Sequence, residues 1–207
     1  MQNAEIELKF PVANPEALQR QLPGLGFLLQ TARTFEHNTL YDTAGRELRG
    51  RRQVLRIRDY GGVCTVTHKR PPEREAGEPV DTTRYKIRVE TETTVAESGA
   101  MAEIFRQLGY VPVFVYDKFR TEWSRGVEGD SGAARHLVID ETAIGNYAEL
   151  EGPTAWIDQT LEELGIDPAA CLTDSYGKLF LDWKQRTGSA AENLTFEEIA
   201  PAAAGVR

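Results

Sequence analysis

Charged and apolar residues alternate near the start of the chain. In the stretch EIELKF, the charged residues Glu5, Glu7 and Lys9 occupy every second position, and apolar residues fill the positions between them. A period of two is that of a β-strand, in which successive side chains point to opposite faces. The stretch therefore predicts a strand with one ionic face and one apolar face.

Similar patterns predict eight strands, over residues 4–12, 35–41, 54–59, 63–69, 85–94, 113–123, 136–141 and 147–151. Apolar residues at helical spacing, with capping residues at the ends, predict helices over about 14–23, 98–108 and 154–164 and from about 173 onward. Strands mostly follow strands, and the Gly61-Gly62 turn suits a hairpin. This order favours an antiparallel α+β fold over a parallel sheet.

The composition is that of a folded, water-soluble protein, with 41% hydrophobic and 27% charged residues in a chain of 207. This length suits one domain, which we expect over residues 1–186, with a flexible C-terminal tail over 187–207. The net charge of −8 argues against nucleic acid as a partner. Because no signal segment or long apolar run is present, we expect a cytoplasmic protein without membrane binding. Cys64 and Cys171 indicate neither a zinc site nor a disulfide framework.

The ionic faces of the predicted strands are the unusual feature. They carry eight basic and eight acidic side chains: Lys9, Arg56, Arg58, Lys69, Lys86, Arg88, Lys118 and Arg120, and Glu5, Glu7, Glu90, Glu92, Glu122, Asp140, Glu149 and Glu151. One interpretation is a sheet whose charged face is in water, as is common in antiparallel proteins.

The alternative interpretation is a closed barrel. The amphipathic helices would cover the apolar face from outside, and the eight strands would enclose the ionic face. Charges in such an interior need a ligand that compensates them. A divalent metal with a polyphosphate matches both the carboxylates and the basic groups.

The same residues resemble a known family. EIELK is similar to the ExExK signature of the CYTH superfamily, the triphosphate tunnel metalloenzymes. The stretches LRIR, THKRP, RVETE, DKFR, VIDETAIGNYAELE and SYGKLF follow in the family's order, over about residues 4–184. The superfamily includes class IV adenylate cyclases, thiamine triphosphatases and inorganic triphosphatases. The resemblance implies an eight-stranded antiparallel β-barrel, the triphosphate tunnel, flanked by helices in a monomer or homodimer.

The resemblance also implies roles for the ionic residues. The ligands of Mg²⁺ or Mn²⁺ would be Glu5, Glu7, Asp140, Glu149 and Glu151. The triphosphate would be bound by Arg56, Arg58, Lys69, Arg88, Lys118 and Arg120. Lys9 would be a general base, or else a phosphate contact or an ion-pair partner of Glu5 or Glu7. Supporting residues Glu90 and Glu92 would bind metal or orient basic neighbours. Lys86 and Glu122 are expected at the rim, and Tyr176 either at the tunnel mouth or in the core of its helix.

Two reactions would use the same residues. In a triphosphatase, metal-assisted water attacks the terminal phosphorus of an inorganic, thiamine or nucleoside triphosphate and releases orthophosphate. In a class IV adenylate cyclase, the 3′-hydroxyl of ATP attacks the α-phosphorus and pyrophosphate leaves. A non-enzymatic polyphosphate-binding module would need the basic residues but not the paired glutamates or Lys9. No adenine-specific signal is evident and P-loop and Rossmann motifs are absent, so the sequence favours metal-dependent hydrolysis of a small-molecule triphosphate.

Overall fold

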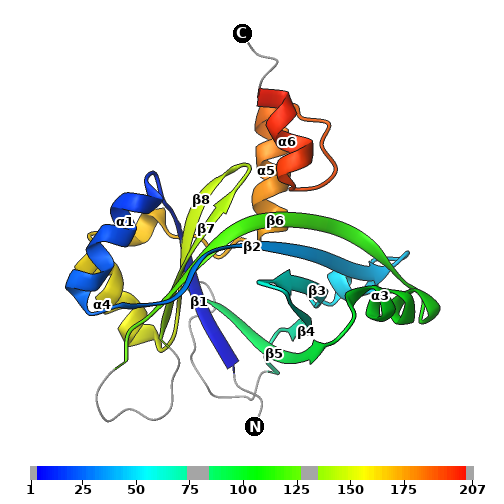
Figure 1. Cartoon of the computed structure of the whole chain (residues 1–207), viewed down its shortest axis with the longest axis horizontal. Coiled ribbons are helices and arrows are strands. Elements are labelled where there is room, and N and C mark those ends of the chain that lie inside the picture. The colour runs from blue at the N-terminus through cyan, green and yellow to red at the C-terminus, as the bar shows by residue number, and fades with distance from the viewer. Residues whose placement is uncertain (1–3, 74–83, 127–134, 204–207) are drawn as a thin grey trace.

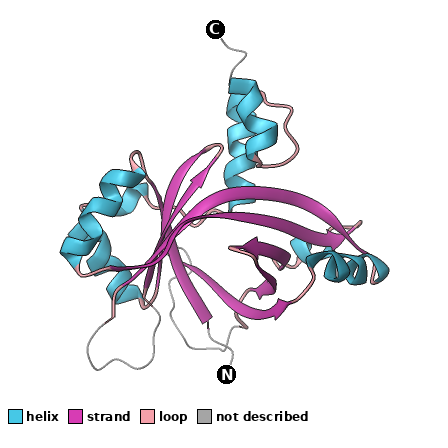
Figure 2. Ribbon diagram, viewed as in Figure 1, coloured by secondary structure: helices cyan, strands magenta, loops and turns pink. Residues whose placement is uncertain are grey.

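The computed structural model describes residues 4–73, 84–126 and 135–203 and contains a closed barrel of eight antiparallel strands (Figures 1 and 2). The strands follow one another around the barrel in the order β1-β5-β4-β3-β2-β6-β7-β8. Their bounds are β1 (Ala4–Pro11), β2 (Leu28–Thr43), β3 (Val54–Tyr60), β4 (Val63–Arg70), β5 (Lys86–Val95), β6 (Tyr110–Ser124), β7 (His136–Thr142) and β8 (Gly145–Glu151). The predicted α+β barrel is confirmed.

Strand pairing places ionic residues opposite one another, and Glu5, Glu7, Lys9 and Glu149 line the interior of the barrel. On β1, Glu5 lies opposite Arg88 of β5, and Lys9 lies opposite Glu149 of β8. Because side chains alternate along a strand, a register that places one ionic residue inside places the others of that strand inside as well. The charged face of the opening strand therefore looks into the barrel.

The apolar faces of the strands lie outside and are covered by helices. On one side, α1 (Pro15–Gln21), the 3₁₀ turn η1 (Leu22–Leu25) and α4 (Thr154–Leu164) pack together over β1, β7 and β8 (Figure 1). Leu8, Leu137, Ile157 and Leu161 are buried in this cluster. On another side, Phe105 of α3 (Ser98–Gln107) packs edge-on against Tyr41 of β2. These contacts supply the apolar burial that stabilises a barrel with an ionic interior.

The C-terminal segment packs against β6. It contains α5 (Tyr176–Thr187) and α6 (Phe196–Ala203), which stand side by side on the barrel in Figure 1. Leu194 is fully buried beside Phe180, and its backbone N–H donates to the Val115 carbonyl at 3.0 Å. The expected tail over residues 187–207 thus contains α6 and Leu194, and Leu194 is held by apolar packing and by backbone hydrogen bonds to β6. Residues 204–207 lie outside the described part.

Two short elements complete the described chain, namely α2 (Glu47–Gly50) and the 3₁₀ turn η2 (Pro168–Ala170). No helix among the described residues combines the length and apolar character that crossing a bilayer requires.

Candidate functional site

A cavity of about 430 Å³ lies inside the barrel. Every strand contributes to its lining, together with Ser175, Tyr176 and Gly177 at the start of α5. The ionic side chains predicted to share a face all line this cavity, except Arg88 and Asp140. Small-molecule sites usually enclose roughly 300–1,000 Å³, so the space is sufficient for such a ligand.

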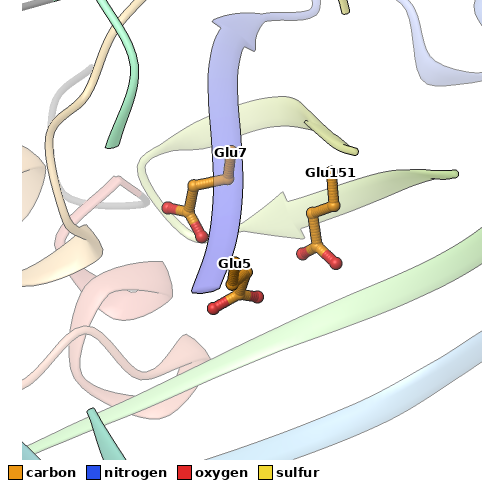
Figure 3. A group of neighbouring side chains, drawn as sticks. All are labelled: Glu5, Glu7 and Glu151. Carbon is orange, nitrogen blue, oxygen red and sulfur yellow. The ribbon is translucent and has the colours of Figure 1, made fainter. Parts of the chain in front are cut away.

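Three carboxylates gather where β1 and β8 pair. One oxygen from each of Glu5, Glu7 and Glu151 lies within 4.8 Å of the others, and Figure 3 shows the three side chains together. Burial, and then repulsion by Glu5, raises the pKa of Glu151 to about 8. A divalent cation would relieve this repulsion. Carboxylate oxygens are hard ligands, so the group fits Mg²⁺ or Mn²⁺.

Two lysines lie beside these carboxylates. The Lys69 ammonium is 2.7 Å from Glu5 and 3.0 Å from Glu90, and Lys86 donates to Glu7. Burial would lower the pKa of Lys69, but the nearby Glu5 carboxylate outweighs this effect, so that the pKa of Lys69 is raised. Lys86 lines the cavity, as does Glu122, so these two side chains lie inside the barrel.

A second cluster joins three basic side chains to two fully buried carboxylates. Arg58 donates to Glu36 at 2.7 Å, and Lys118 lies 3.3 Å from Glu36 and 2.9 Å from Asp140. Arg120 donates to both oxygens of Asp140, at 2.7 and 2.6 Å. Burial would raise the pKa of Glu36, but Lys118, Arg120 and Arg58 hold it well below its usual range. Glu36 is therefore ionised at neutral pH.

The contacts of Asp140 suit an anchor for basic side chains. Its carboxylate also accepts a hydrogen bond from the Tyr176 hydroxyl at 2.7 Å, in addition to those from Lys118 and Arg120. Asp140 lies outside the group formed by Glu5, Glu7 and Glu151. The metal role that the family resemblance implied for Asp140 thus finds no support in this geometry.

Lys9 and Glu149 face each other across β1 and β8. The Lys9 ammonium is 3.0 Å from Glu149, donates to the Asp174 carbonyl at 3.0 Å and lies 3.9 Å from the centre of the Tyr176 ring. Burial would raise the pKa of Glu149, but Lys9 and Arg120 lower it well below its usual range. The carboxylate, the carbonyl and the ring face all suit a protonated lysine. The ion-pair partner of Lys9 is Glu149, and not Glu5 or Glu7 as the sequence suggested.

Arg56 lies beside a second pair of carboxylates, Glu90 and Glu92. It donates to the Tyr116 hydroxyl at 3.3 Å and lies 4.0 Å from Glu90 and 3.9 Å from Glu92. Burial opposes the charge of Arg56, but contact with Tyr116 contributes to a net rise of its pKa. Glu90 and Glu92 lie beside basic groups and outside the three-carboxylate group. This arrangement supports the orienting role among the two alternatives for these residues.

Arg88 is set apart from the other basic residues. It pairs with Glu5 in the strand register, but its guanidinium donates to the Ile87 carbonyl at 3.0 Å, and it does not line the cavity. Burial, and then the nearby Arg52, lowers the pKa of Arg88. The structure therefore does not bring Arg88 together with the predicted phosphate ligands.

Sequence reasoning missed two contributors to this site, Glu36 and Tyr116. Glu36 lies in a predicted strand, but its neighbours at period two are Asn38 and Leu40, so that strand shows no run of charges. Tyr116 precedes Lys118 by two positions, so alternation placed it on the same face, yet a tyrosine alone is a weak signal.

The fold and the cavity define a domain in which a closed antiparallel barrel surrounds an ionic site. The family model described as the CYTH domain matches residues 3–167, so this chain belongs to the CYTH family. The resemblance found in the sequence is thus confirmed. Membership supports an activity on triphosphate compounds.

Similar proteins agree with this assignment. A Methanocaldococcus jannaschii protein named "Putative adenylate cyclase" is 28% identical over 163 residues, which cover 77% of this chain and 85% of that protein. A solved structure named as a putative adenylate cyclase of Vibrio parahaemolyticus has a TM-score of 0.67 at 18% identity, covering 87% of this chain and 99% of the other. A Hippeastrum protein, described as a putative adenylyl cyclase with a dominant triphosphatase activity, has a TM-score of 0.57 at 22% identity, covering 86% and 95%. The two solved structures share the fold.

Proposed function

We propose that this protein is a divalent-metal-dependent triphosphatase that hydrolyses a triphosphate inside the barrel. The observation that carries the proposal is the pairing of two sites in one cavity: a group of three carboxylates and a set of basic side chains. A metal–triphosphate complex carries both kinds of charge, so each part of it meets the opposite charge.

Glu5, Glu7 and Glu151 are the residues proposed to hold Mg²⁺ or Mn²⁺. Their oxygens are close enough to share one ion, and burial together with the nearby Glu5 raises the pKa of Glu151. The bound ion would supply Lewis-acid polarisation of a phosphoryl oxygen and a water of lowered pKa. In this assignment Glu149 and Asp140 hold basic residues instead of metal.

The basic side chains are proposed to bind the phosphates. Arg56, Arg58, Lys118 and Arg120 line the cavity from β3 and β6. They would compensate the charge that shifts between phosphoryl oxygens during transfer. The contacts of Lys9 favour a charged ammonium, so we assign it a phosphate contact in preference to a general base.

Adenylate cyclase is the alternative, and one feature of the cavity favours it. Leu40, Val54 and Phe114 also line the space, and apolar side chains gain nothing from an inorganic phosphate but can bury an organic group. The names of the similar proteins point to the same reaction. A polyphosphate-binding module is the non-enzymatic alternative. Such a module needs basic residues but does not require the three carboxylates of Glu5, Glu7 and Glu151.

One experiment separates these functions. Purified protein is incubated with Mg²⁺ or Mn²⁺ and, in separate reactions, with tripolyphosphate, thiamine triphosphate and ATP, and the products are resolved by ³¹P NMR. Orthophosphate indicates the hydrolase, whereas pyrophosphate with cyclic AMP indicates the cyclase. Substrates that bind but stay intact with both metals indicate the module and contradict the proposal.

A substitution at Glu149 tests the carboxylate that pairs with both Lys9 and Arg120. Glu149→Gln should abolish turnover while triphosphate binding persists at reduced strength, because both basic groups lose their shared anionic partner. Initial rates and a binding titration measure the two effects. Glu141→Gln is the matched control, since Glu141 pairs with Arg33 away from the cavity. Full activity of the Glu149 variant would contradict its place in the site.

A further inference from the structure

Glu36 occupies an unusual position in the barrel. It is 0% exposed, and its carboxylate is surrounded by donors from Arg58, Lys118 and Asn38, with Arg120 Nε at 3.8 Å. These three basic residues line the cavity, whereas Glu36 does not. Glu36 thus lies behind the basic groups, where it is screened from any ligand that enters the cavity.

Glu36 joins basic residues from two different strands. β2, which carries Glu36, lies between β3 and β6 in the barrel. Arg58 belongs to β3, and Lys118 and Arg120 belong to β6. Asp140 also holds Lys118 and Arg120, but no contact of Asp140 with Arg58 is found among the described residues. Arg58 also lies 3.9 Å from Glu122 of β6, but its contact with Glu36 is shorter, at 2.7 Å. Glu36 is therefore the carboxylate that holds Arg58 together with the two basic groups of β6.

The contacts with Glu36 leave donors for a ligand. Arg58 uses Nη2 for Glu36, and its Nη1 makes no hydrogen bond among the described residues. Lys118 has three N–H groups, of which Glu36 and Asp140 together take two. Glu36 and Asp140 therefore use only some of the N–H groups of Arg58 and Lys118. The other N–H groups remain for a ligand.

We propose that Glu36 is a positioning residue that sets the spacing between Arg58 and the pair Lys118 and Arg120. This spacing makes the cavity bind a triphosphate more tightly than a shorter phosphate chain. The inference rests on the proposed function in one respect, namely that these basic groups bind phosphate. Fixed spacing presents donors to successive phosphates without the entropy cost of ordering free side chains. Pyrophosphate has one phosphate fewer and depends less on that spacing.

Two other roles of Glu36 make different predictions. If Glu36 only offsets positive charge, its neutralisation leaves the cavity more positive and strengthens the binding of any polyphosphate. If Glu36 only stabilises the fold, its replacement lowers the melting temperature but leaves the affinity of the folded protein unchanged.

The test uses Glu36→Gln and Glu36→Asp in the full chain. The first variant keeps the size of the side chain and removes its charge, and the second keeps the charge and shortens its reach by one methylene. Titration calorimetry in low-salt buffer with EDTA measures the affinities for tripolyphosphate and pyrophosphate, and thermal unfolding establishes that each variant is folded at the assay temperature. Glu141→Gln, on the outer face, is the control that should match the wild type.

A positioning role predicts that Glu36→Gln weakens tripolyphosphate binding by about tenfold or more, the effect of losing one charge-assisted hydrogen bond. Glu36→Asp should weaken it by less, and in both variants pyrophosphate should lose less affinity than tripolyphosphate. Tighter binding in Glu36→Gln, or normal affinities in both folded variants, would overturn the proposal, as would a wild type that binds neither anion. If Glu36→Gln does not fold, Glu36→Asp decides. Failure of the wild type to turn over any triphosphate with metal would contradict the proposed function and leave these affinities interpretable.

Discussion

Replacement of Asp140 by asparagine should strongly destabilise the metal-free protein. Asp140 is 0% exposed and accepts hydrogen bonds from Lys118, from two nitrogens of Arg120 and from the Tyr176 hydroxyl. Asparagine keeps the shape and one acceptor oxygen, but its amide nitrogen is a donor that faces other donors. Two buried basic groups would then lose the anionic partner that they share, while Lys118 keeps Glu36 and Arg120 keeps Glu149.

The size of the effect follows from these contacts. Removal of one partner from a buried ion pair costs about 3–5 kcal/mol when the remaining charge has no other partner. Because Lys118 retains Glu36 and Arg120 retains Glu149, we expect a loss of about 3 kcal/mol, at the lower end of this range. Natural domains have unfolding free energies of about 5–15 kcal/mol, so the substitution would remove a large share of the stability. For a chain of 207 residues, where each kcal/mol shifts the melting temperature by about 2–4 °C, the expected decrease is roughly 6–12 °C.

Chemical denaturation in EDTA at neutral pH measures this difference, with Glu141→Gln as the surface control. The same measurement tests the metal role that the family resemblance implied for Asp140. If Asp140 were one of several carboxylates that repel each other until metal binds, its neutralisation would stabilise the metal-free protein. A free energy of unfolding within about 1 kcal/mol of wild type, or above it, would refute the anchoring role.

Two further predictions concern Glu151 and Arg56. The folded-state pKa of Glu151 is raised from 4.5 to about 8, so its contribution to the stability of the metal-free protein is fully present below pH 4.5 and is lost as the pH rises through about 8. Thermal unfolding in EDTA between pH 5 and 9 should show this decrease, and Glu151→Gln should reduce it; an equal decrease in that variant would contradict the assignment. Arg56→Ala should raise the KM for the triphosphate by about tenfold or more, with a smaller effect on kcat, because it removes a charged phosphate contact. An unaltered KM would count against this contact.

The barrel and most of its lining could be predicted because they rest on a strictly local rule. Alternation fixes the face of each side chain, so runs such as Glu5, Glu7 and Lys9 revealed a shared interior before any pairing was known. The ends of the long strands were not predictable in this way. The pairing of β2 with β6 contains register shifts between Leu29 and Thr34, and such irregularities break the period that reveals a strand.

The sequence did not reveal which carboxylates anchor basic side chains and which gather as a group, because this depends on neighbours in three dimensions. Asp140 and Glu151 both lie on ionic faces in the sequence, yet Asp140 contacts three donor side chains, whereas Glu151 lies beside Glu5 and Glu7. The ordered segment around Leu194 was missed for a similar reason. Leu194, Phe196 and Ile199 stand among small and acidic residues without a sustained period. The burial of Leu194 comes from packing against β6.

The segment that follows the family match also helps to close the interior. Leu172 exchanges backbone hydrogen bonds with Lys9, and the nearby Asp174 carbonyl and Tyr176 ring hold the ammonium of Lys9. These residues follow residue 167, where the family model ends. A fragment that ended at residue 167 would keep all eight strands but lose the part of the cavity lining that Ser175, Tyr176 and Gly177 provide. Sequence changes confined to this short stretch would therefore alter the ligand specificity of the cavity and leave the barrel unchanged.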